Sequence, residues 1–176
     1  LSSSSAASDV YKRQSLHWSS LFPFVNIIGH EFAHSIDSCN LPKEHQKAFG
    51  NLVKCLEQNR HAFPSGKLPP PQFEGKGCKN PIDENFGDWF GVETLSVLIN
   101  RPGSPLHKLG RQNLINGLAN SMPLCASGRV NSNHHGADQF RLEMILSNPD
   151  LRSKVGCVSA GRVPYCTFNS PSPQQG

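Results

Sequence analysis

The residues best suited to chemistry are two histidines and a glutamate in one short segment. Residues 30–34 read HEFAH, so His30 and His34 are four positions apart and Glu31 follows the first of them. On a helix, residues four apart lie one above the other, so two imidazole rings can bind one zinc ion. The segment therefore predicts a zinc site with Glu31 as the general base. Two surface histidines with a salt-bridging glutamate are the alternative interpretation.

A second acidic segment offers the remaining groups that such a site needs. Residues 84–88 read ENFGD. A catalytic zinc ion usually has three protein ligands and an open position for water, and Glu84 fits the third ligand. Asp88, one turn later, can accept the free ring N–H of a zinc-bound histidine, and Asp37, three residues after His34, can do the same from the first predicted helix. A solvated acidic face is the alternative interpretation of this second segment.

The candidate site residues lie in segments whose apolar residues have the spacing of helices. Phe24, Ile27, Ile28 and Phe32 form a stripe of helical periodicity around the first motif. We predict helices over Phe22–Ser38, Pro42–Asn59, Asp83–Ile99, Leu109–Ser121, Gln139–Ser147 and Pro149–Val155, with Asp83 as the cap of the third. The prolines and glycines of 63–81 predict a long loop, and 127–137 a polar loop. No strand pattern is convincing, so the predicted fold class is mainly α.

The composition is that of one soluble domain. The chain has 176 residues, of which 36% are hydrophobic, and a formal net charge of +4. The basic residues form no stripe, so we do not expect nucleic acid as a partner. No apolar run approaches the roughly 18 residues of a membrane span.

The two ends are set apart from the rest of the chain. Residues 1–14 are a Ser/Ala run followed by SDVYKRQ. This segment resembles translated sequencing-adapter read-through, and a natural serine-rich tail is the alternative. We therefore assign the domain to residues 15–168 and expect residues 169–176 to be a disordered tail.

Four motifs follow one another in a specific order. They are GHEFAHSID at 29–37, ENFGD at 84–88, CAS and VNS within 125–132, and FRL at 140–142, after which Asn148 and the cysteines at 157 and 166 follow. Together they resemble the neprilysin and endothelin-converting-enzyme family of zinc metallopeptidases. The resemblance covers residues 20–168 and implies the C-terminal helical part of a gluzincin-type catalytic domain.

The resemblance implies a role for each residue of the site. It assigns one zinc ion per chain to His30, His34 and Glu84, general-base and proton-donor chemistry to Glu31, and the orientation of ligands to Asp88 and Asp37. His135 would stabilise the oxyanion of the tetrahedral intermediate, with its neighbour His134 as a competitor for that role. Arg141 would bind a backbone carbonyl of a peptide substrate. The implied activity is endopeptidase cleavage of oligopeptides.

The sequence also departs from the family pattern. Trp89 and Phe90 stand where the family has two glycines, and Asn169 stands where it has a tryptophan. The family's substrate-binding strand and large N-terminal region are not in this chain. We therefore expect a missing N-terminal part of the same enzyme, and we expect the activity of the chain alone to be affected by its absence.

The six cysteines favour an oxidising compartment. They contain no CxxC pair, so a structural zinc ribbon is not indicated, and six cysteines allow 15 connectivities. The resemblance implies a Cys55–Cys166 bond and leaves Cys125 and Cys157 to the missing part, with Cys39–Cys78 as the remaining pair. We expect an extracytoplasmic protein, in a bacterial envelope or secreted, with a membrane-anchored ectodomain also open. Free buried thiols are the alternative.

Three other functional hypotheses stay open at this point. The chain can belong to another metallopeptidase family that uses the same helix-plus-glutamate site. It can also be an inactive homologue that acts as a peptide-binding module. The third is a helical domain with accidental histidines.

Overall fold

The computed structural model describes residues 20–36, 49–62, 81–121, 138–156 and 163–169, and these residues contain helices and no strand. Residues 20–33 are helical and are followed by α3 (Gly50–His61), α4 (Pro81–Asn100), the 3₁₀ helix η2 (Leu106–Lys108), α5 (Arg111–Ser121), α6 (Asp138–Ser147) and α7 (Pro149–Val155). The prediction of a mainly α fold is therefore confirmed for the described part of the chain. The segments 1–14 and 170–176 lie outside it.

Several predicted helix boundaries need correction. The first helix ends at Ala33 and not at Ser38, because the N–H groups of Ser35 and Ile36 bond to carbonyls three residues back and tighten the chain into a turn. Helix α4 begins at Pro81, so Asp83 lies inside the first turn and is not the cap. A proline is favourable at the first helical position, because its missing N–H would have no partner there.

The other boundaries are closer to the prediction. Helix α3 continues to His61, two residues beyond the predicted end, and α5 begins at Arg111. Helix α7 has the predicted bounds, since Asn148 caps it with its side chain and Gly156 ends it with a positive φ of 70°. The predicted helical residues 42–48 and the predicted loops at 63–80 and 127–137 are outside the described residues.

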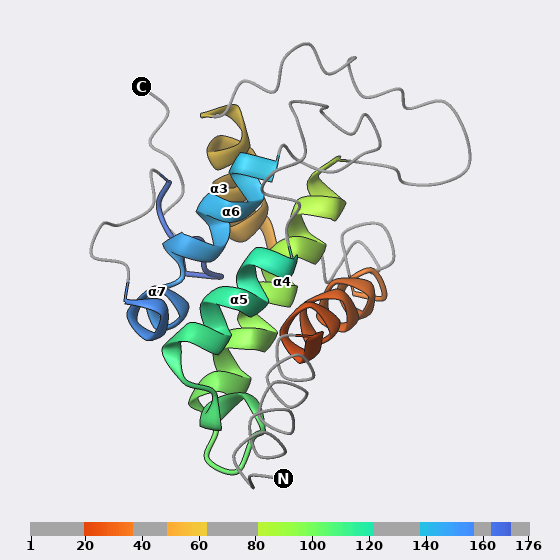
Figure 1. Cartoon of the computed structure of the whole chain (residues 1–176). Helices are drawn as coiled ribbons and strands as arrows, with labels where there is room; N and C mark the ends of the chain where they lie inside the picture. The colour runs from red at the N-terminus through yellow and green to blue at the C-terminus, as the bar shows by residue number, and fades with distance from the viewer. Residues whose placement is uncertain (1–19, 37–48, 63–80, 122–137, 157–162, 170–176) are drawn as a thin grey trace, which may run out of the picture.

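Helix α4 is the central element of the fold. Figure 1 shows it running through the middle of the molecule, and it contacts α3, η2, α6 and α7. It contributes to both hydrophobic clusters, with Val92, Leu95 and Ile99 in one and Phe86 and Trp89 in the other. Each fully buried side chain of this kind stabilises the fold by about 1.5–3 kcal/mol. Packing in these two clusters therefore fixes both halves of α4, and with them the residues that the helix carries.

Helix 20–33 packs against α4 through glycines. A Cβ on Gly91 would lie 2.7 Å from the backbone carbonyl oxygen of Asn26, and one on Gly29 would lie 3.0 Å from the Cα of Gly91. A contact as short as the one at Gly91 is essentially never found for a real Cβ atom, and the one at Gly29 is tighter than nearly all of them, so larger residues would force the two helices apart. The two backbones therefore approach more closely than most helix pairs.

This close packing decides which face of helix 20–33 is buried. The buried side carries Phe22, Asn26, Gly29, His30 and Ala33. The apolar stripe that indicated the helix in the sequence instead lies on the opposite side, where Phe24, Ile27, Ile28 and Phe32 are each more than half exposed. The helical period of the stripe was informative, but it did not mark the face that packs on α4.

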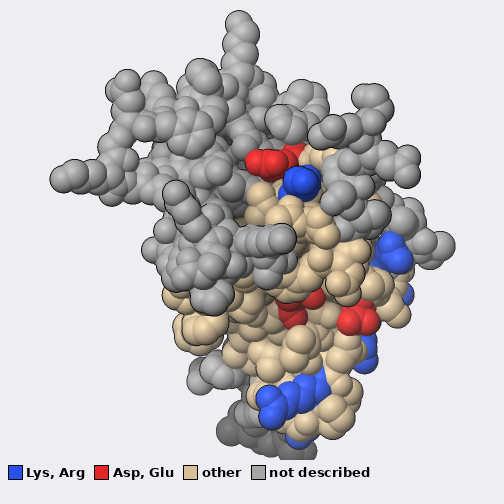
Figure 2. Space-filling view, turned by 180° about the vertical axis from the view of Figure 1, so that it is seen from behind, with Lys and Arg blue, Asp and Glu red and all other residues tan. Residues whose placement is uncertain are grey.

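The surface of the described residues carries few charges. On the face shown in Figure 2, most of the described surface is uncharged, and acidic and basic side chains lie next to each other in places. None of the helices described here has the length and apolar character needed to cross a bilayer.

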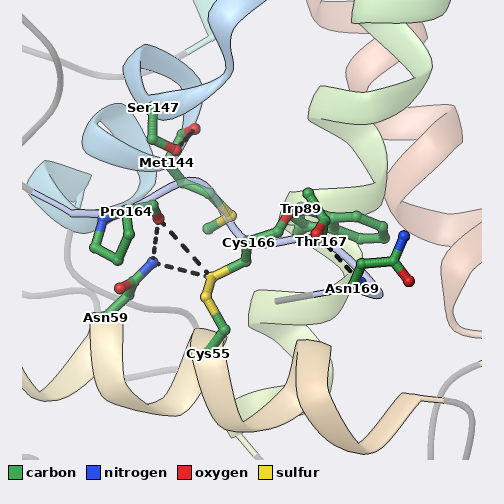
Figure 3. The surroundings of a disulfide bond; sticks show 9 residues. All are labelled: Cys55, Asn59, Trp89, Met144, Ser147, Pro164, Cys166, Thr167 and Asn169. Carbon is green, nitrogen blue, oxygen red and sulfur yellow. Dashed lines mark hydrogen bonds between the residues drawn. A yellow bond between two sulfur atoms is a disulfide. The ribbon is translucent and has the colours of Figure 1, made fainter. Parts of the chain in front are cut away.

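The C-terminal segment 163–169 is fastened to α3 and α4. Cys166 forms a disulfide with Cys55 of α3, which is the pairing that the family resemblance implied. Figure 3 shows Asn59, one turn further along α3, donating from Nδ2 to the Pro164 carbonyl oxygen at 2.8 Å and to the Cys166 sulfur at 3.1 Å. The Trp89 indole N–H donates to the Cys166 carbonyl oxygen at 2.9 Å. These bonds fix the segment beside the centre of α4.

Removing this disulfide is expected to destabilise the protein strongly. The bond closes a loop with a sequence separation of 111 residues, so it restricts the unfolded chain. The double variant Cys55→Ala/Cys166→Ala should lose about 2–5 kcal/mol of unfolding free energy. Urea denaturation of both proteins at equal pH measures the difference. A loss below about 1 kcal/mol would show that the bond contributes little.

Candidate metal centre

Three side chains from two elements converge at one point. His30 lies in the last turn of helix 20–33, His34 follows that helix directly, and Glu84 lies in the first turn of α4. The Nε2 atoms of the two histidines are 3.1 Å apart. Glu84 Oε2 lies 3.2 Å from Nε2 of His30 and 3.7 Å from Nε2 of His34. The close contact of the two helices brings together residues that are fifty positions apart in the sequence.

The spacing of these donor atoms fits a zinc ion. Ligands placed tetrahedrally at about 2.0–2.1 Å from one zinc ion lie about 3.3–3.4 Å from each other. The three observed separations, 3.1, 3.2 and 3.7 Å, lie on both sides of that value. Two imidazoles and one carboxylate are also a donor set that zinc prefers. Among the described residues, this is the group of His, Cys, Asp and Glu side chains able to hold a metal ion.

The site is partly buried and open on one side. The His30 side chain is 10% exposed, whereas those of Glu84 and His34 are 24% and 30% exposed. A metal bound here would therefore be held from the buried side by His30 and would keep access to solvent past the other two ligands. With three protein ligands, a tetrahedral zinc ion would have one coordination position left for water, as catalytic zinc sites have.

Asp88 holds the ring of His30 from behind. Asp88 Oδ1 accepts a hydrogen bond from Nδ1 of His30 at 3.0 Å, and this leaves Nε2 directed at Glu84 and His34. The same oxygen accepts from Nη2 of Arg141 on α6 at 2.7 Å. A carboxylate in this position fixes the tautomer and the orientation of a ligating imidazole. The structure thus places Asp88 where its predicted orienting role requires it.

Gly87 provides the surface on which the His30 ring rests. A Cβ at this position would lie 2.8 Å from Cε1 and 2.9 Å from Nδ1 of His30. Any side chain here would therefore push the imidazole away from α4, and with it the Nε2 atom that faces Glu84. The glycine between Glu84 and Asp88 is thus part of what positions the first histidine.

The surroundings of His30 favour its protonated form. Burial by itself lowers the pKa of His30, but its hydrogen bonds and charge attraction to Asp88 and Glu84 outweigh burial and raise the pKa from 6.5 to about 9. A metal ion must displace this proton to reach Nε2, so metal binding is expected to release protons.

The raised pKa predicts how stability depends on pH. The folded metal-free protein holds the His30 proton more tightly than the unfolded chain does, so this stabilisation is complete below pH 6.5. It is lost as the pH rises through about 9. In the presence of a chelator, the unfolding free energy of the wild type should fall over this range relative to His30→Gln. Parallel pH curves for the two proteins would contradict the prediction.

The remaining predicted residues are placed as follows. Glu31 has an exposed side chain next to His30, and it is three residues from His34, so the two are neighbours on the helix surface. Arg141 lies beside the centre with its guanidinium on Asp88. The positions of Asp37, His135 and His134 are outside the described residues.

The sequence did not reveal the contact between Arg141 and Asp88. The two residues are 53 positions apart, and each had been given a separate role. Only the motif order, ENFGD before FRL, carried a signal that they belong to one site. The packing role of Gly87 was also missed, although a glycine between two acidic site residues was visible in the sequence.

Several polar atoms near these residues have no hydrogen-bond partner. They are both side-chain polar atoms of Asn85, Oδ2 of Asp88 and Nε of Arg141, all buried. Buried polar groups are usually paired, so these unpaired atoms are unusual for a folded interior.

Comparison with protein-family models, with curated proteins and with solved structures found no match to this chain.

Proposed function

We propose that the chain is the C-terminal helical part of a gluzincin-type catalytic domain, akin to the neprilysin family, and acts as a zinc-dependent endopeptidase on oligopeptides. The observation that carries this proposal is the convergence of His30 Nε2, His34 Nε2 and Glu84 Oε2 at separations suited to one zinc ion. The exposed carboxylate of Glu31 next to the first ligand supplies the base that peptide hydrolysis needs.

Each residue of the proposed centre has a separate role in peptide hydrolysis. His30, His34 and Glu84 would hold a zinc ion, which would supply a water molecule of lowered pKa and polarisation of the scissile carbonyl. Glu31 takes the proton from the attacking water and later gives it to the leaving amine. Asp88 keeps Nδ1 of His30 protonated and its Nε2 free for the metal.

Arg141 contributes a donor for the peptide. One nitrogen of its guanidinium is held by Asp88, which fixes the plane of the group. The side chain is 23% exposed, and we assign the guanidinium nitrogens that Asp88 does not engage as donors to a substrate carbonyl. We keep His135 as the oxyanion donor of the proposal, since stabilisation of the developing oxyanion is the other requirement of peptide hydrolysis.

The proposed setting is extracytoplasmic, in a bacterial envelope or secreted. The Cys55–Cys166 disulfide supports it, because such bonds persist in oxidising compartments. The proposed partners are peptide substrates and an N-terminal part of the same enzyme.

Two measurements on the zinc-loaded protein test this function. The first follows cleavage of a mixed oligopeptide pool by mass spectrometry, with and without a chelator. The second measures binding of a peptide hydroxamate, whose head group binds active-site zinc, so it reports on the site even where turnover is slow. Chelator-sensitive cleavage or zinc-dependent hydroxamate binding supports the proposal. If the zinc-loaded protein does neither, the proposed function is wrong.

A further inference from the structure

A second concave site lies on the far side of α4 from the metal centre. It is a groove of about 450 Å³, lined by α4 and by the C-terminal segment 163–169. Its acidic residue, Glu93, is nine positions after Glu84, which places it about 13 Å further along the helix and on the opposite side. The groove has the volume of a small-molecule site. Neither the metal ligands nor Arg141 lines it.

Glu93 is the acidic group of this groove, and it is held in place from two sides. Its Oε1 accepts a hydrogen bond from the Tyr165 hydroxyl at 2.7 Å and another from Nδ2 of Asn148 at 3.0 Å. No lysine, arginine or histidine is among the described residues that line the groove. The carboxylate therefore has neutral donors as its neighbours and no cationic partner in the described part of the chain.

Burial disfavours the ionised form of the Glu93 carboxylate. Burial raises the pKa of Glu93, and the hydrogen bonds from Tyr165 and Asn148 lower it only in part. The pKa of the Tyr165 hydroxyl is raised by burial and by its bond to Glu93, so the hydroxyl remains a donor. A cation beside Glu93 would offset the cost of burying its charge.

Aromatic rings form the walls around this carboxylate. Trp89, Phe90, Tyr165 and Phe168 all line the groove. The ring of Trp89 meets that of Phe168 at 88° with centroids 5.5 Å apart, and that of Phe90 at 65° with centroids 6.4 Å apart. These edge-to-face contacts join the rings into one continuous aromatic surface of the groove, and the faces of aromatic rings attract organic cations.

The other end of the groove is aliphatic. Val97, one turn after Glu93, and Leu98 line it, and the side chain of Val97 is 62% exposed. The Thr94 hydroxyl donates to the Phe90 carbonyl oxygen at 2.9 Å, so it is already engaged within the helix. The groove thus has one acidic aromatic end and one apolar end.

We propose that this groove binds a small organic ammonium ion with a short hydrocarbon tail. The alkylated ammonium group lies against the aromatic walls and beside the Glu93 carboxylate, and the tail covers Val97 and Leu98. A quaternary ammonium is the best match, because it is attracted to ring faces and to a carboxylate but needs no hydrogen-bond acceptor. The site does not depend on the metal centre or on peptidase activity.

Three probes with the same tail and different head-group charge test this site. Calorimetric titration of the whole chain would use hexyltrimethylammonium as the cation, 1-heptanol as the neutral compound and heptanoate as the anion, below micelle-forming concentrations. The cation should bind at least about tenfold more tightly than the alcohol, and the anion should bind least. Equal affinity for the cation and the alcohol would overturn the proposal, because the groove would then be a generic apolar surface.

Two variants and a control locate the binding. Glu93→Gln keeps an oxygen acceptor for Tyr165 and Asn148 but removes the charge, and it should weaken binding of the cation at least about tenfold. Glu57→Gln makes the same charge change at an exposed position on α3 and should leave affinity unchanged. Phe168→Leu keeps an apolar side chain at the groove. It should weaken binding of the cation and leave the affinity for the alcohol unchanged. Unchanged cation affinity in both groove variants, with wild-type helical circular dichroism, would overturn the assignment to this groove.

Discussion

Replacing Glu84 with glutamine is expected to weaken zinc binding by more than about 100-fold. The change keeps the size of the side chain but removes the negative charge of the carboxylate that lies 3.2 Å from His30 Nε2. Removing a group that only orients a ligand already costs about 10–100-fold in metal affinity, so the loss of a direct ligand should cost more. Competition with a fluorescent zinc chelator at constant pH measures the affinity of both proteins.

The control for this experiment is Glu57→Gln, because it removes the same charge from an exposed position on α3. It should bind zinc as the wild type does. Asp88→Asn gives a useful intermediate case, since it weakens the hydrogen bond to His30 Nδ1 without removing a ligand. The wild type should bind zinc most tightly, Asp88→Asn more weakly, and Glu84→Gln most weakly. If Glu84→Gln binds zinc as tightly as the control, Glu84 is not a ligand.

Glu31→Gln is expected to abolish most peptide hydrolysis while leaving zinc in place. The side chain is exposed beside His30 and does not belong to the group of metal-binding atoms. Loss of a general base typically lowers the rate by about 10²–10⁴-fold. Rates on the peptides found to be cleaved by the zinc-loaded protein, with zinc content measured on the same samples, test this prediction.

The separation of the two readouts makes this prediction specific. A variant that lost zinc would also lose activity, so only a protein with full zinc content and low turnover identifies Glu31 as the base. Glu57→Gln on α3 removes a carboxylate at an exposed position that is not among the metal-binding residues, and it should retain activity. If Glu31→Gln hydrolyses peptides at the wild-type rate, another group accepts the proton and the proposed mechanism is wrong.

Local sequence patterns indicated that helices would be present and which residues could form the donor set, although several helix boundaries were wrong. The spacing of His30 and His34 depends only on helical geometry, and Glu84 with Asp88 are one turn apart on α4 for the same reason. The Asn-Pro pair at 148–149 is a strong start signal, and α7 has the predicted bounds. These features depend on neighbouring residues in the sequence, so they can be predicted without knowledge of the tertiary structure.

The parts that could not be predicted depend on contacts between distant segments. The exposure of the Phe24–Phe32 stripe follows from the close approach of Gly29 and Gly91, which no helical period encodes. The early end of helix 20–33 is a different case, because a local turn at residues 34–36 ends it and the sequence pattern did not indicate that turn. The bonds from Tyr165 and Asn148 to Glu93 join residues 72 and 55 positions apart, and no motif linked them.

The central claim is that one zinc ion is bound by His30, His34 and Glu84 together. A crystal structure of the zinc-loaded protein, with anomalous diffraction recorded on both sides of the zinc absorption edge, tests it most directly. The account predicts one zinc per chain, with Nε2 of both histidines and a carboxylate oxygen of Glu84 at about 2.0–2.2 Å from the metal. A zinc ion bound elsewhere, or Glu84 turned away from a metal held by the histidines, would contradict it.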